Sequence, residues 1–581
     1  MEFNLAKNRD NLIFLPLGGA NEIGMNLNLY QLDGKWIMID CGVGFANDTP
    51  GVDMMTPDIS FIKKHKKNLL GLVVTHIHED HLGAIQYLWK ELEVPVYATK
   101  FASNFLKTKL LEYKLDKEVP IHLINGDKDL ELGPFKMEFI GLTHSVPEMK
   151  ALMLKTSKGN VLHTGDWKFD PDPVVGDVSE KSRIKEYGDR GDILAMVCDS
   201  TNALSTGHSR SEGELHESLK GLIKGRKGYV GVATFASNLA RIHTICQIAK
   251  EVGRKVVLAG FSLNRLYEVA KKSGYLEGDF EFISDREAKH YKKDELLIIC
   301  TGCQGEPRAA TRKIANDMHR SIHFTKGDLM IFSSKIIPGN EKKIFELFDE
   351  LAQKKIDVIT EKDHFVHVSG HPSQDELREM YALAKPKIAI PVHGEFLHTK
   401  AHAELATDCG VPRVIQVENG VAVNINPDNH MQSEIVGKVK SGYLGVDGKQ
   451  LIDLDSTIIK ERRKLQEAGI VTLSLVLNDS LKMVTNPRIM TIGSYDLDND
   501  LVAEELLFNE IQTFLKNKAR ELKLNDGIGI KFLQKKRKRQ KLSGTKINKE
   551  LEKSLRSKLT KIFMDLMGKK PAIEVTIHLV S

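Results

Sequence analysis

Cysteine is scarce in this sequence: 6 residues among 581, with only 3 tryptophans beside them. Most of the cysteines lie inside apolar segments, where reduced and buried thiols are expected, so nothing indicates the disulfide framework of a small secreted protein. Cys300 and Cys303 form one C-x-x-C pair, but a structural zinc site would need a second pair. We interpret this pair as coincidental.

Long apolar runs are absent as well. No run reaches the ~18 residues that a helix needs to cross a bilayer, and residues 1–7 lack the charged-then-apolar order of a signal peptide. We therefore expect a cytoplasmic protein without a membrane partner. A strong excess of one charge is also missing, because 83 Lys and Arg face 78 Asp and Glu. Net charge alone thus gives no reason to expect nucleic acid as a partner.

What the chain does contain is a histidine-rich turn at residues 75–83, with the sequence THIHEDHLG. The turn carries these potential metal ligands: His76, His78, Asp80 and His81. It follows an apolar run at 69–74 that predicts a buried strand, and it precedes a helical pattern at 84–89. Imidazoles and a carboxylate crowded into one turn are costly to bury unless a single partner satisfies them. The segment therefore predicts a metal site, whose nitrogen and oxygen donors suit Zn²⁺ or Mn²⁺.

Three further polar residues, Asp40, His144 and Asp166, each follow a predicted strand. Loops beyond strand ends can carry polar groups over a rigid base, and open sheets place their chemistry there. His144 and Asp166 are therefore candidates for the same site. Asp40 could orient one of the ligands from behind, although capping of its own loop is the ordinary alternative.

Together these residues resemble the metallo-β-lactamase superfamily, with H-x-H-x-D-H followed by a later His and a later Asp. The resemblance implies an α/β fold of two mixed sheets packed as an αββα sandwich with helices outside. It also implies two divalent metal ions with the following ligands: His76, His78 and His144 for one, Asp80 and His81 for the other, and Asp166 bridging them. Asp40 matches an early aspartate that supports a ligand in this superfamily. The substrate stays open, because the superfamily includes lactamases, thioesterases and nucleases.

The middle of the chain repeats a strand-then-helix pattern. Apolar strands are predicted, with helices between them, at 230–234, 256–259, 296–299 and 329–332. This alternation is typical of a parallel sheet, so we expect an inserted α/β domain. The polar loops 235–238, which contains Ser237, and 333–340 each precede a helix, and the first N–H groups of a helix suit phosphate. Simple helix capping by Ser and Asn is the alternative.

The chain then returns to histidine-rich loops. One loop contains His367, Val368, Ser369, Gly370 and His371, and His393 follows a later apolar strand. Together with Asp199, these loops resemble the β-CASP nucleases and, within them, the ribonuclease J family, over about residues 10 to 450. Asp199, His371 and His393 match three motifs that this group adds to the superfamily pattern. Cys303 departs from the pattern, because a serine is expected there.

The resemblance implies roles for these loops. His393 completes the ligands of the second ion, and the loop from His367 to His371 holds the phosphate of a terminal nucleotide. We place Ser237 at the same phosphate site. For the leaving oxygen, His371 oriented by Asp199 is the candidate general acid, because a carboxylate partner favours the protonated imidazole.

The function that the resemblance implies is hydrolysis of RNA phosphodiesters in RNA maturation and decay. It implies a 5′-to-3′ exonuclease that prefers single-stranded RNA with a 5′-monophosphate, together with endonuclease cutting. It also implies a homodimer or homotetramer assembled through the C-terminal domain. Two other functions stay open. A small-molecule hydrolase of the same superfamily would need no second domain to hold a polymer, and an RNA-binding scaffold whose metal only stabilises the fold would need no general acid.

The domain boundaries expected from these patterns divide the sandwich into two segments. We predict a metallo-β-lactamase domain at 1–205 and 361–440, a β-CASP domain at 206–360, a linker at 441–463 and a small α/β domain at 464–581. The last domain contains the basic run 535–541, which could neutralise phosphates without sequence preference. A solvated loop with no partner is an equally good interpretation of that run.

Overall fold

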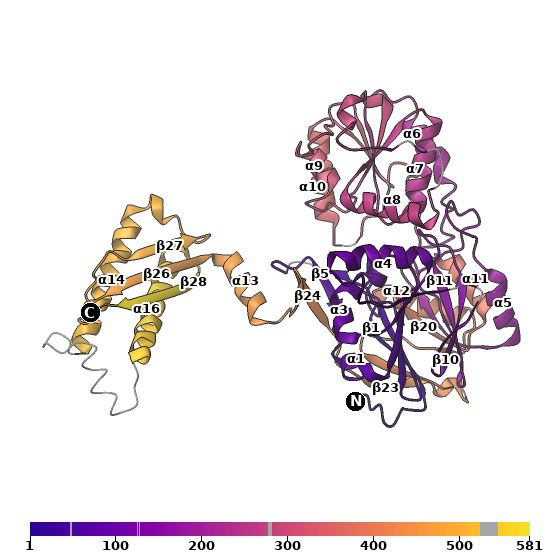
Figure 1. Cartoon of the computed structure of the whole chain (residues 1–581), viewed down its shortest axis with the longest axis horizontal. Coiled ribbons are helices and arrows are strands. Elements are labelled where there is room, and N and C mark those ends of the chain that lie inside the picture. Colours follow the sequence, from indigo (N-terminus) through magenta and orange to yellow (C-terminus); the bar gives the residue numbers. More distant parts are fainter. Residues whose placement is uncertain are drawn as a thin grey trace. The chain divides into compact units, whose positions relative to one another are not determined.

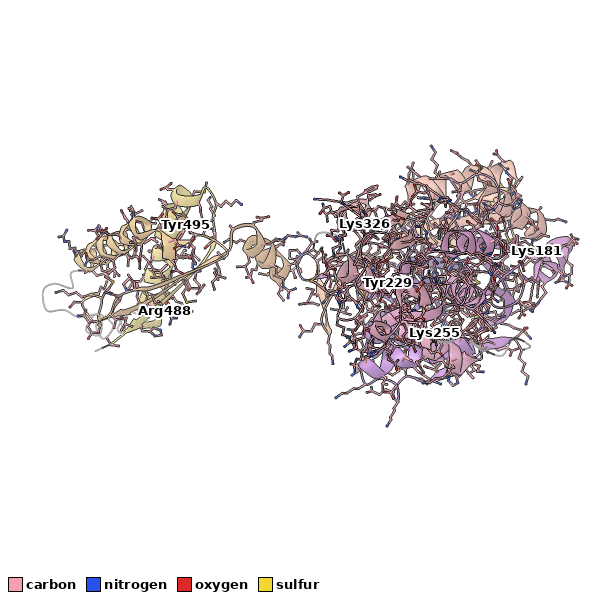
Figure 2. The ribbon with its side chains drawn as sticks, turned by 90° about the horizontal axis from the view of Figure 1, so that it is seen from above. Lys181, Tyr229, Lys255, Lys326, Arg488 and Tyr495 are labelled. Atoms are coloured by element: carbon pink, nitrogen blue, oxygen red, sulfur yellow. The ribbon has the colours of Figure 1, made fainter. Side chains whose placement is uncertain are left out.

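The computed structural model describes residues 1–46, 49–124, 126, 128–276, 280, 282–337, 339–426, 428–522 and 544–580. The basic run 535–541, predicted as a possible phosphate-neutralising loop, lies outside these residues. The chain forms two compact units, Met1–Asn47 with Met54–Leu451 and Asp48–Asp53 with Ile452–Ser581 (Figure 1). Figure 2 shows the same units from above, with Lys181 in the first and Tyr495 in the second.

The first unit contains a large mixed sheet of strand order β23-β22-β1-β2-β3-β6-β7-β8. Its strands are β1 Leu12–Gly18, β2 Leu27–Leu32, β3 Lys35–Ile39, β6 Leu69–Val73, β7 Val96–Ala98, β8 Ile121–Leu123, β22 Val421–Ile425 and β23 Glu434–Lys438. β1 and β2 are buried along their whole length, which requires cover on both faces of the sheet.

A second mixed sheet of order β21-β20-β13-β12-β11-β10-β9 faces the first. Its strands are β9 Leu130–Leu132, β10 Phe135–Gly141, β11 Lys150–Thr156, β12 Gly159–His163, β13 Ile193–Asp199, β20 Ile388–Val392 and β21 Arg413–Val414. One hydrophobic cluster joins the sheets, because it contains Phe14 and Ile39 of the first together with Leu154 and Ile390 of the second. The core of the sandwich therefore lies between the two sheets.

Helices cover the outer faces of both sheets. Those on the first sheet are α1 Ser60–Lys64, α3 Ile85–Leu92 and α4 Lys100–Glu112, and those on the second are α5 Lys181–Arg190, α11 Gln374–Ala384 and α12 Phe396–Asp408. Trp36 of β3 shares a buried cluster with Leu88 of α3, and Met196 of β13 shares another with Leu377 of α11. The predicted αββα sandwich is confirmed.

The inserted domain has a sheet of order β16-β15-β17-β14-β18-β19, in which every strand pair is parallel. Its strands are β14 Val230–Ala233, β15 Lys255–Ala259, β16 Phe282–Ile283, β17 Leu296–Cys300, β18 Leu329–Phe332 and β19 Asp357–Ile359. Its helices are α6 Leu215–Ile223, α7 Leu239–Glu251, α8 Phe261–Ser273, α9 Ala310–Ala315 and α10 Glu341–Gln353, and they flank the sheet on both sides (Figure 1).

The segment 441–463, predicted as a linker, instead forms regular structure. β24 Tyr443–Asp447 pairs antiparallel with β5 Met54–Pro57, and the four-stranded sheet is completed by β4 Gly44–Phe45 and β25 Gln450–Asp453. α13 Thr457–Ala468 then begins after Ser456, whose side chain caps it. Gly448 has a φ of +61°, which suits the turn between β24 and β25 as well as it would suit a flexible linker.

The second unit is a small α/β domain, as the sequence predicts. Its sheet has the order β27-β26-β28, with β26 Ile470–Leu477 parallel to β28 Ala572–Leu579 and antiparallel to β27 Arg488–Ile492. α14 Leu501–Glu521 and α16 Gly544–Met567 contribute Leu507 and Leu555 to a core shared with the sheet. Within the described ranges, no helix combines the length and the apolar character that crossing a bilayer requires.

Candidate metal centre and substrate pocket

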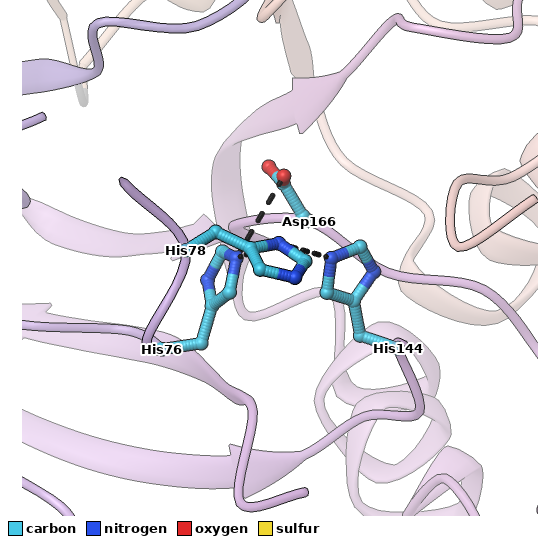
Figure 3. Close-up of side chains that lie close together, drawn as sticks. All are labelled: His76, His78, His144 and Asp166. Atoms are coloured by element: carbon cyan, nitrogen blue, oxygen red, sulfur yellow. Dashed lines mark hydrogen bonds and ion pairs between the residues drawn. The ribbon is translucent and has the colours of Figure 1, made fainter. Parts of the chain in front are cut away.

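Three imidazoles converge at the end of β6 (Figure 3). Nδ1 of His78 lies 3.0 Å from Nε2 of His76 and 3.0 Å from Nε2 of His144. Asp166 completes the group, with Oδ2 3.9 Å from Nε2 of His76. One ligand atom of each residue lies within 4.8 Å of the others, so the group could hold a divalent metal ion.

Hydrogen bonds behind two of these rings fix which nitrogen faces the group. Nδ1 of His144 donates to the carbonyl oxygen of Gly370 at 2.6 Å. Nδ1 of His76 lies 3.0 Å from Oγ1 of Thr75, whose own proton is donated to Asp40 at 2.9 Å. Each Nδ1 therefore carries the ring proton, and each Nε2 lone pair is directed at the point where the rings meet.

A second group lies on the other side of Asp166. Oδ2 of Asp166 is 3.0 Å from Nε2 of His81 and 3.2 Å from Nε2 of His393, and Oδ2 of Asp80 is 3.7 Å from both nitrogens. These atoms also lie within 4.8 Å of one another. One carboxylate thus adjoins both groups, as a bridging ligand between two ions would.

Asp40 supports the second group by binding the nitrogen of His81 that faces away from Asp166. Its Oδ2 accepts the Nδ1 proton of His81 at 2.7 Å, and its Oδ1 accepts the backbone N–H of Thr75 at 2.8 Å. Nε2 of His81 is therefore left free to face Asp166. Asp40 has a φ of +62°, a backbone conformation that asparagine and aspartate tolerate better than most residues.

The loop 19–26 holds His393 and His81 together. The backbone N–H of His393 donates to the carbonyl oxygen of Gly19 at 2.6 Å, and the N–H of Gly24 donates to Nδ1 of His393 at 3.3 Å. Nδ2 of Asn26, a buried side chain, lies 3.0 Å from Nε2 of His81 and 3.1 Å from Nδ1 of His393. Asn26 and His393, which are 367 positions apart in the sequence, therefore share one cluster.

The electrostatics of the two groups differ. Burial and the neighbouring rings hold the pKa values of His76 and His78 well below the ordinary range, and burial lowers the pKa of His144 to about 3. Burial acts in the same direction on His81 and His393, but the nearby carboxylates, Asp166 above all, outweigh it and raise both pKa values. The first group is thus a set of neutral donors, whereas in the second group the carboxylates favour the protonated form of both rings.

His371 and Asp199 form a hydrogen-bonded pair next to these groups. Nδ1 of His371 lies 2.7 Å from Oδ2 of Asp199 and 3.9 Å from Oδ2 of Asp166. Burial would lower the pKa of His371, but the charge of Asp199 outweighs it, and the pKa is raised. Thr201 donates both its backbone N–H and its hydroxyl to Oδ1 of Asp199 and so fixes the carboxylate.

A pocket with a volume of about 200 Å³ adjoins this pair. It is lined by Asn202, Ser205, Ser209, Arg210, Lys335, Glu361, Phe365, His367, Val368, Ser369 and Ser373. Nδ2 of Asn202 donates to Oγ of Ser369 at 2.7 Å and to the carbonyl oxygen of His371 at 3.1 Å. Hydroxyl groups with a guanidinium and an ammonium suit a phosphate group.

The structure brings most of the predicted site residues together. The predicted metal ligands meet around Asp166, and the predicted phosphate loop contributes His367, Val368 and Ser369 to the pocket. Gly370 acts through its carbonyl oxygen on His144, and Ser237 lies in the turn before α7 without lining the pocket.

Sequence reasoning missed several residues. Thr75 and Asn26 contact ligands, and Ser209 and Arg210 line the pocket, yet none of them was a candidate. Thr75 could have been found, because it begins the histidine-rich turn. Nothing in the sequence marks Asn26, whose partner His393 is 367 positions away.

Comparison with known proteins adds three family models that match the chain. They are the Metallo-beta-lactamase superfamily at residues 26–208, the Ribonuclease J, beta-CASP domain at 227–351 and the Zn-dependent metallo-hydrolase RNA specificity domain at 355–421. The first and third match parts of the two segments of the sandwich, and the second matches most of the inserted sheet and its helices. Every residue that meets at Asp166 lies inside the first or the third.

Curated relatives resemble the chain over most of its length. A protein named Ribonuclease J from Sinorhizobium meliloti is 42% identical over 508 residues, which are 86% of this chain and 89% of that protein. Ribonuclease J from Corynebacterium glutamicum is 37% identical, over 82% of this chain and 66% of its own. Ribonuclease J2 from Bacillus subtilis is 34% identical, over 84% of this chain and 88% of its own.

Proposed function

The chain belongs to the ribonuclease J family, and on that premise we propose that it is a metal-dependent ribonuclease that degrades RNA from the 5′ end. The position of Asp166 carries the proposal. Its Oδ2 lies 3.9 Å from Nε2 of His76, 3.0 Å from that of His81 and 3.2 Å from that of His393. The same oxygen is 3.9 Å from the ring of His371. One carboxylate therefore joins two ligand groups to a proton donor.

The proposed cofactor is a pair of divalent ions, Zn²⁺ or Mn²⁺, because imidazole and carboxylate donors suit both metals. His76, His78 and His144 would hold one ion, Asp80, His81 and His393 the other, and Asp166 would bridge them. When bound, such a pair lowers the pKa of an attacking water and offsets the charge that develops on the phosphoryl oxygens. The neutral rings of the first group are ready to bind without losing a proton.

His371 is the proposed general acid. The leaving ribose oxygen needs a proton, and Asp199 holds the Nδ1 proton of His371 while raising its pKa. Nε2 of the same ring is then available to the leaving oxygen. Asp199 and Thr201 orient the ring, because the threonine donates two hydrogen bonds to the carboxylate.

The pocket beside His371 is the proposed site for the 5′-monophosphate. Ser369 and Ser209 offer hydroxyl groups, and Lys335 offers positive charge, whereas the guanidinium of Arg210 is already paired with Glu214 at 2.6 Å. A phosphate held there would set the first phosphodiester at a fixed distance from Asp166, which would favour 5′-to-3′ removal of nucleotides from single-stranded RNA. Endonuclease cutting is the second proposed activity, for RNA that passes through the site without its end in the pocket.

The proposed setting is RNA maturation and decay in the cytoplasm, where the six free cysteines would stay reduced. We also propose that the protein assembles as a homodimer or homotetramer through its C-terminal domain. Among the described residues, β27 and β28 each have one edge without a neighbouring strand, which supports this assembly, because an unpaired strand edge can pair with another chain.

The proposal can be tested with one transcript in two forms, carrying a 5′-monophosphate or a 5′-triphosphate and labelled at one end. We expect mononucleotides from the monophosphate form, much slower release from the triphosphate form, and no release in a chelator. Internal fragments from both forms would reveal the endonuclease activity.

Two results would contradict the proposal. Binding of RNA without release of any nucleotide, in saturating Zn²⁺ or Mn²⁺, would favour an RNA-binding scaffold. Hydrolysis of small esters or lactams with RNA left intact would favour a small-molecule hydrolase. Equal rates on the two 5′ ends would overturn only the end preference.

A further inference from the structure

A buried arginine joins the two crossovers between the sandwich and the inserted domain. Arg241 lies in the first turn of α7, and its side chain is 0% exposed. Glu212 belongs to the segment that enters the inserted domain, and Val366 belongs to the segment that leaves it. Arg241 contacts both, together with Ser333 at the carboxyl end of β18.

All three nitrogens of the guanidinium are used. Nε and Nη2 donate to the two carboxylate oxygens of Glu212 at 2.5 and 3.0 Å. Nη1 donates to the carbonyl oxygen of Ser333 at 3.0 Å, to its Oγ at 2.5 Å and to the carbonyl oxygen of Val366 at 3.3 Å. Oγ of Ser333 also donates to the carbonyl oxygen of Val366, at 2.6 Å. The planar guanidinium group of an arginine can make all of these contacts, whereas the single ammonium group of a lysine cannot.

The clamp, meaning Arg241, Glu212, Ser333 and Val366, adjoins the proposed phosphate pocket. Val366 is followed directly by His367, Val368 and Ser369, which line that pocket. Nδ1 of His367 is buried and has no hydrogen-bond partner among the described residues. A shift of Val366 would therefore move the wall of the pocket.

Glu212, on the other side of the clamp, is connected by hydrogen bonds to the segment that follows Asp166. The backbone N–H of Glu212 donates to Oδ2 of Asp170 at 3.0 Å, and Oγ of Ser211 donates to Oδ1 of Asp170 at 2.5 Å. Nζ of Lys168 forms an ion pair with Asp170 at 2.7 Å, and both residues lie in the segment that follows Asp166. Buried polar contacts thus run from the Asp166 loop to the pocket wall.

Stability alone does not account for the buried pair. Removing two charges from water costs several kcal/mol for each ion, and apolar side chains of similar volume often stabilise a protein equally well. A clamp that fixes distances gives the pair a different use. Arg241 binds three parts of the molecule at once. They are the segment that enters the inserted domain, the segment that leaves it, and the carboxyl end of β18.

We propose that Arg241 is a positioning residue that sets the preference of the enzyme for 5′-monophosphate ends, by fixing the pocket wall at one distance from Asp166. This inference rests on the proposed function, because it needs the pocket to hold the terminal phosphate. Arg241 itself does not touch the substrate. Its effect should therefore appear in recognition of the 5′ end and not in the chemical step.

The test compares kcat and KM on one RNA that carries either a 5′-monophosphate or a 5′-hydroxyl. Arg241→Lys keeps the positive charge and loses the planar guanidinium group. The double variant Arg241→Met, Glu212→Gln removes both charges of the buried pair. We expect KM for the monophosphate RNA to rise roughly tenfold, as for the loss of a charge-assisted contact. KM for the hydroxyl RNA and both kcat values should change little.

Arg254→Lys is the matched control. Arg254 is also buried, and Nη1 donates to the carbonyl oxygens of Gly228 at 3.1 Å and Leu296 at 2.7 Å. These residues lie at the amino ends of β14 and β17, whereas Ser333 lies at the carboxyl end of the parallel strand β18. This variant should lose a comparable buried guanidinium group. The ratio of KM for the monophosphate RNA to KM for the hydroxyl RNA should stay as in the wild type.

Ser333→Ala provides a milder second variant, which removes one hydroxyl from the clamp and keeps both charges. It should raise KM for the monophosphate RNA severalfold, and a thermal midpoint close to that of the wild type would show that it folds. Unchanged end preference in this variant and in the Arg241 variants, beside a clear preference in the wild type, would overturn the inference alone. A wild-type enzyme without any preference would overturn the proposed end specificity and the inference together.

Discussion

At the scale of single residues, the neighbours of each imidazole decide what it can do. His76, His78 and His144 lie against one another, and their lowered pKa values leave lone pairs for a cation. His371 is partly buried, but the Asp199 carboxylate raises its pKa. The same side chain thus suits the proposed role of metal ligand in one place and of proton donor a few ångströms away.

The role of His371 predicts how its removal will behave. His371→Ala should slow RNA hydrolysis by roughly two to four decades, as for other acid–base groups. The metal content, measured by mass spectrometry of the purified protein, should not change. His323→Ala, an exposed histidine of the inserted domain, is the control and should retain full activity. A variant that loses its metal would show that His371 is a ligand instead.

The sequence predicts the ligands of this site better than the residues that support them. His and Asp at the spacing of His76, His78 and Asp80 have few other uses, so their pattern alone indicates a metal. Asn26 and Arg241 are ordinary in the sequence. Their importance comes from partners such as His393 and Val366, which lie 367 and 125 positions away.

At the scale of secondary-structure elements, an ionic cluster ties α5 to the second sheet. Glu138 of β10 accepts hydrogen bonds from Arg183 at 2.6 Å and from Tyr187 at 2.6 Å, both on α5. Lys155 of the neighbouring strand β11 lies 2.5 Å from the same carboxylate. Burial would raise the pKa of Glu138, but these three partners outweigh it and lower the pKa to about 2.

This cluster predicts a pH-dependent stability. A carboxyl group whose pKa is lower in the folded protein contributes stability that is complete above its ordinary pKa of about 4.5 and is lost as the pH falls through 2. Glu138→Gln should therefore lower the free energy of unfolding by about 1 kcal/mol at pH 7, a value reduced for partial solvent screening. The difference from the wild type should shrink as the pH falls from 4.5 towards 2.

Urea unfolding at pH 7 and pH 3 measures this difference. Glu131→Gln is the matched control, because Glu131 on β9 forms an exposed ion pair with Lys136 in the same sheet. It should change the stability little at either pH. A Glu138→Gln effect of equal size at both pH values would contradict the assigned charge state.

Helices and strands with a regular spacing of apolar residues were predictable from the sequence, and glycine-rich segments were not. The hairpin of β2 and β3 and the parallel strands of the inserted domain appear where their apolar patterns place them. The segment 441–463 was expected to be a linker, because Gly442, Gly445 and Gly448 suit a flexible chain. They suit the turns and strands of a small sheet equally well, and only the pairing of β24 with β5 decides between the two.

At the scale of the whole molecule, each of the two units has its own hydrophobic core. The residues of the candidate metal centre all lie in the first unit. In the part of the second unit that the structure describes, both edges of the sheet lack a further strand, and on the edge strand β27 the side chains of Met490 and Ile492 are exposed. Exposed apolar residues on an unpaired edge are a common place for chains to associate.

Removal of residues 456–581, which are most of the second unit, should therefore lower the oligomeric state. A chain that ends at residue 455 keeps β25 and omits α13 and all that follows. We expect light scattering to give a monomer for this chain and a dimer or tetramer for the full chain. The shortened chain should still bind its metal ions. A shortened chain with the same number of subunits as the full chain would place the interface in the first unit.

The proposed chemistry depends most on two cations held by seven side chains: His76, His78, Asp80, His81, His144, Asp166 and His393. Anomalous diffraction from crystals of the zinc- or manganese-loaded protein tests this directly. We expect two peaks roughly 3.5–4 Å apart, as in other two-metal sites, one beside His144, one beside His393, and Asp166 in contact with both. A single peak, or none, in a protein that still degrades RNA in the presence of a chelator would contradict the two-metal site.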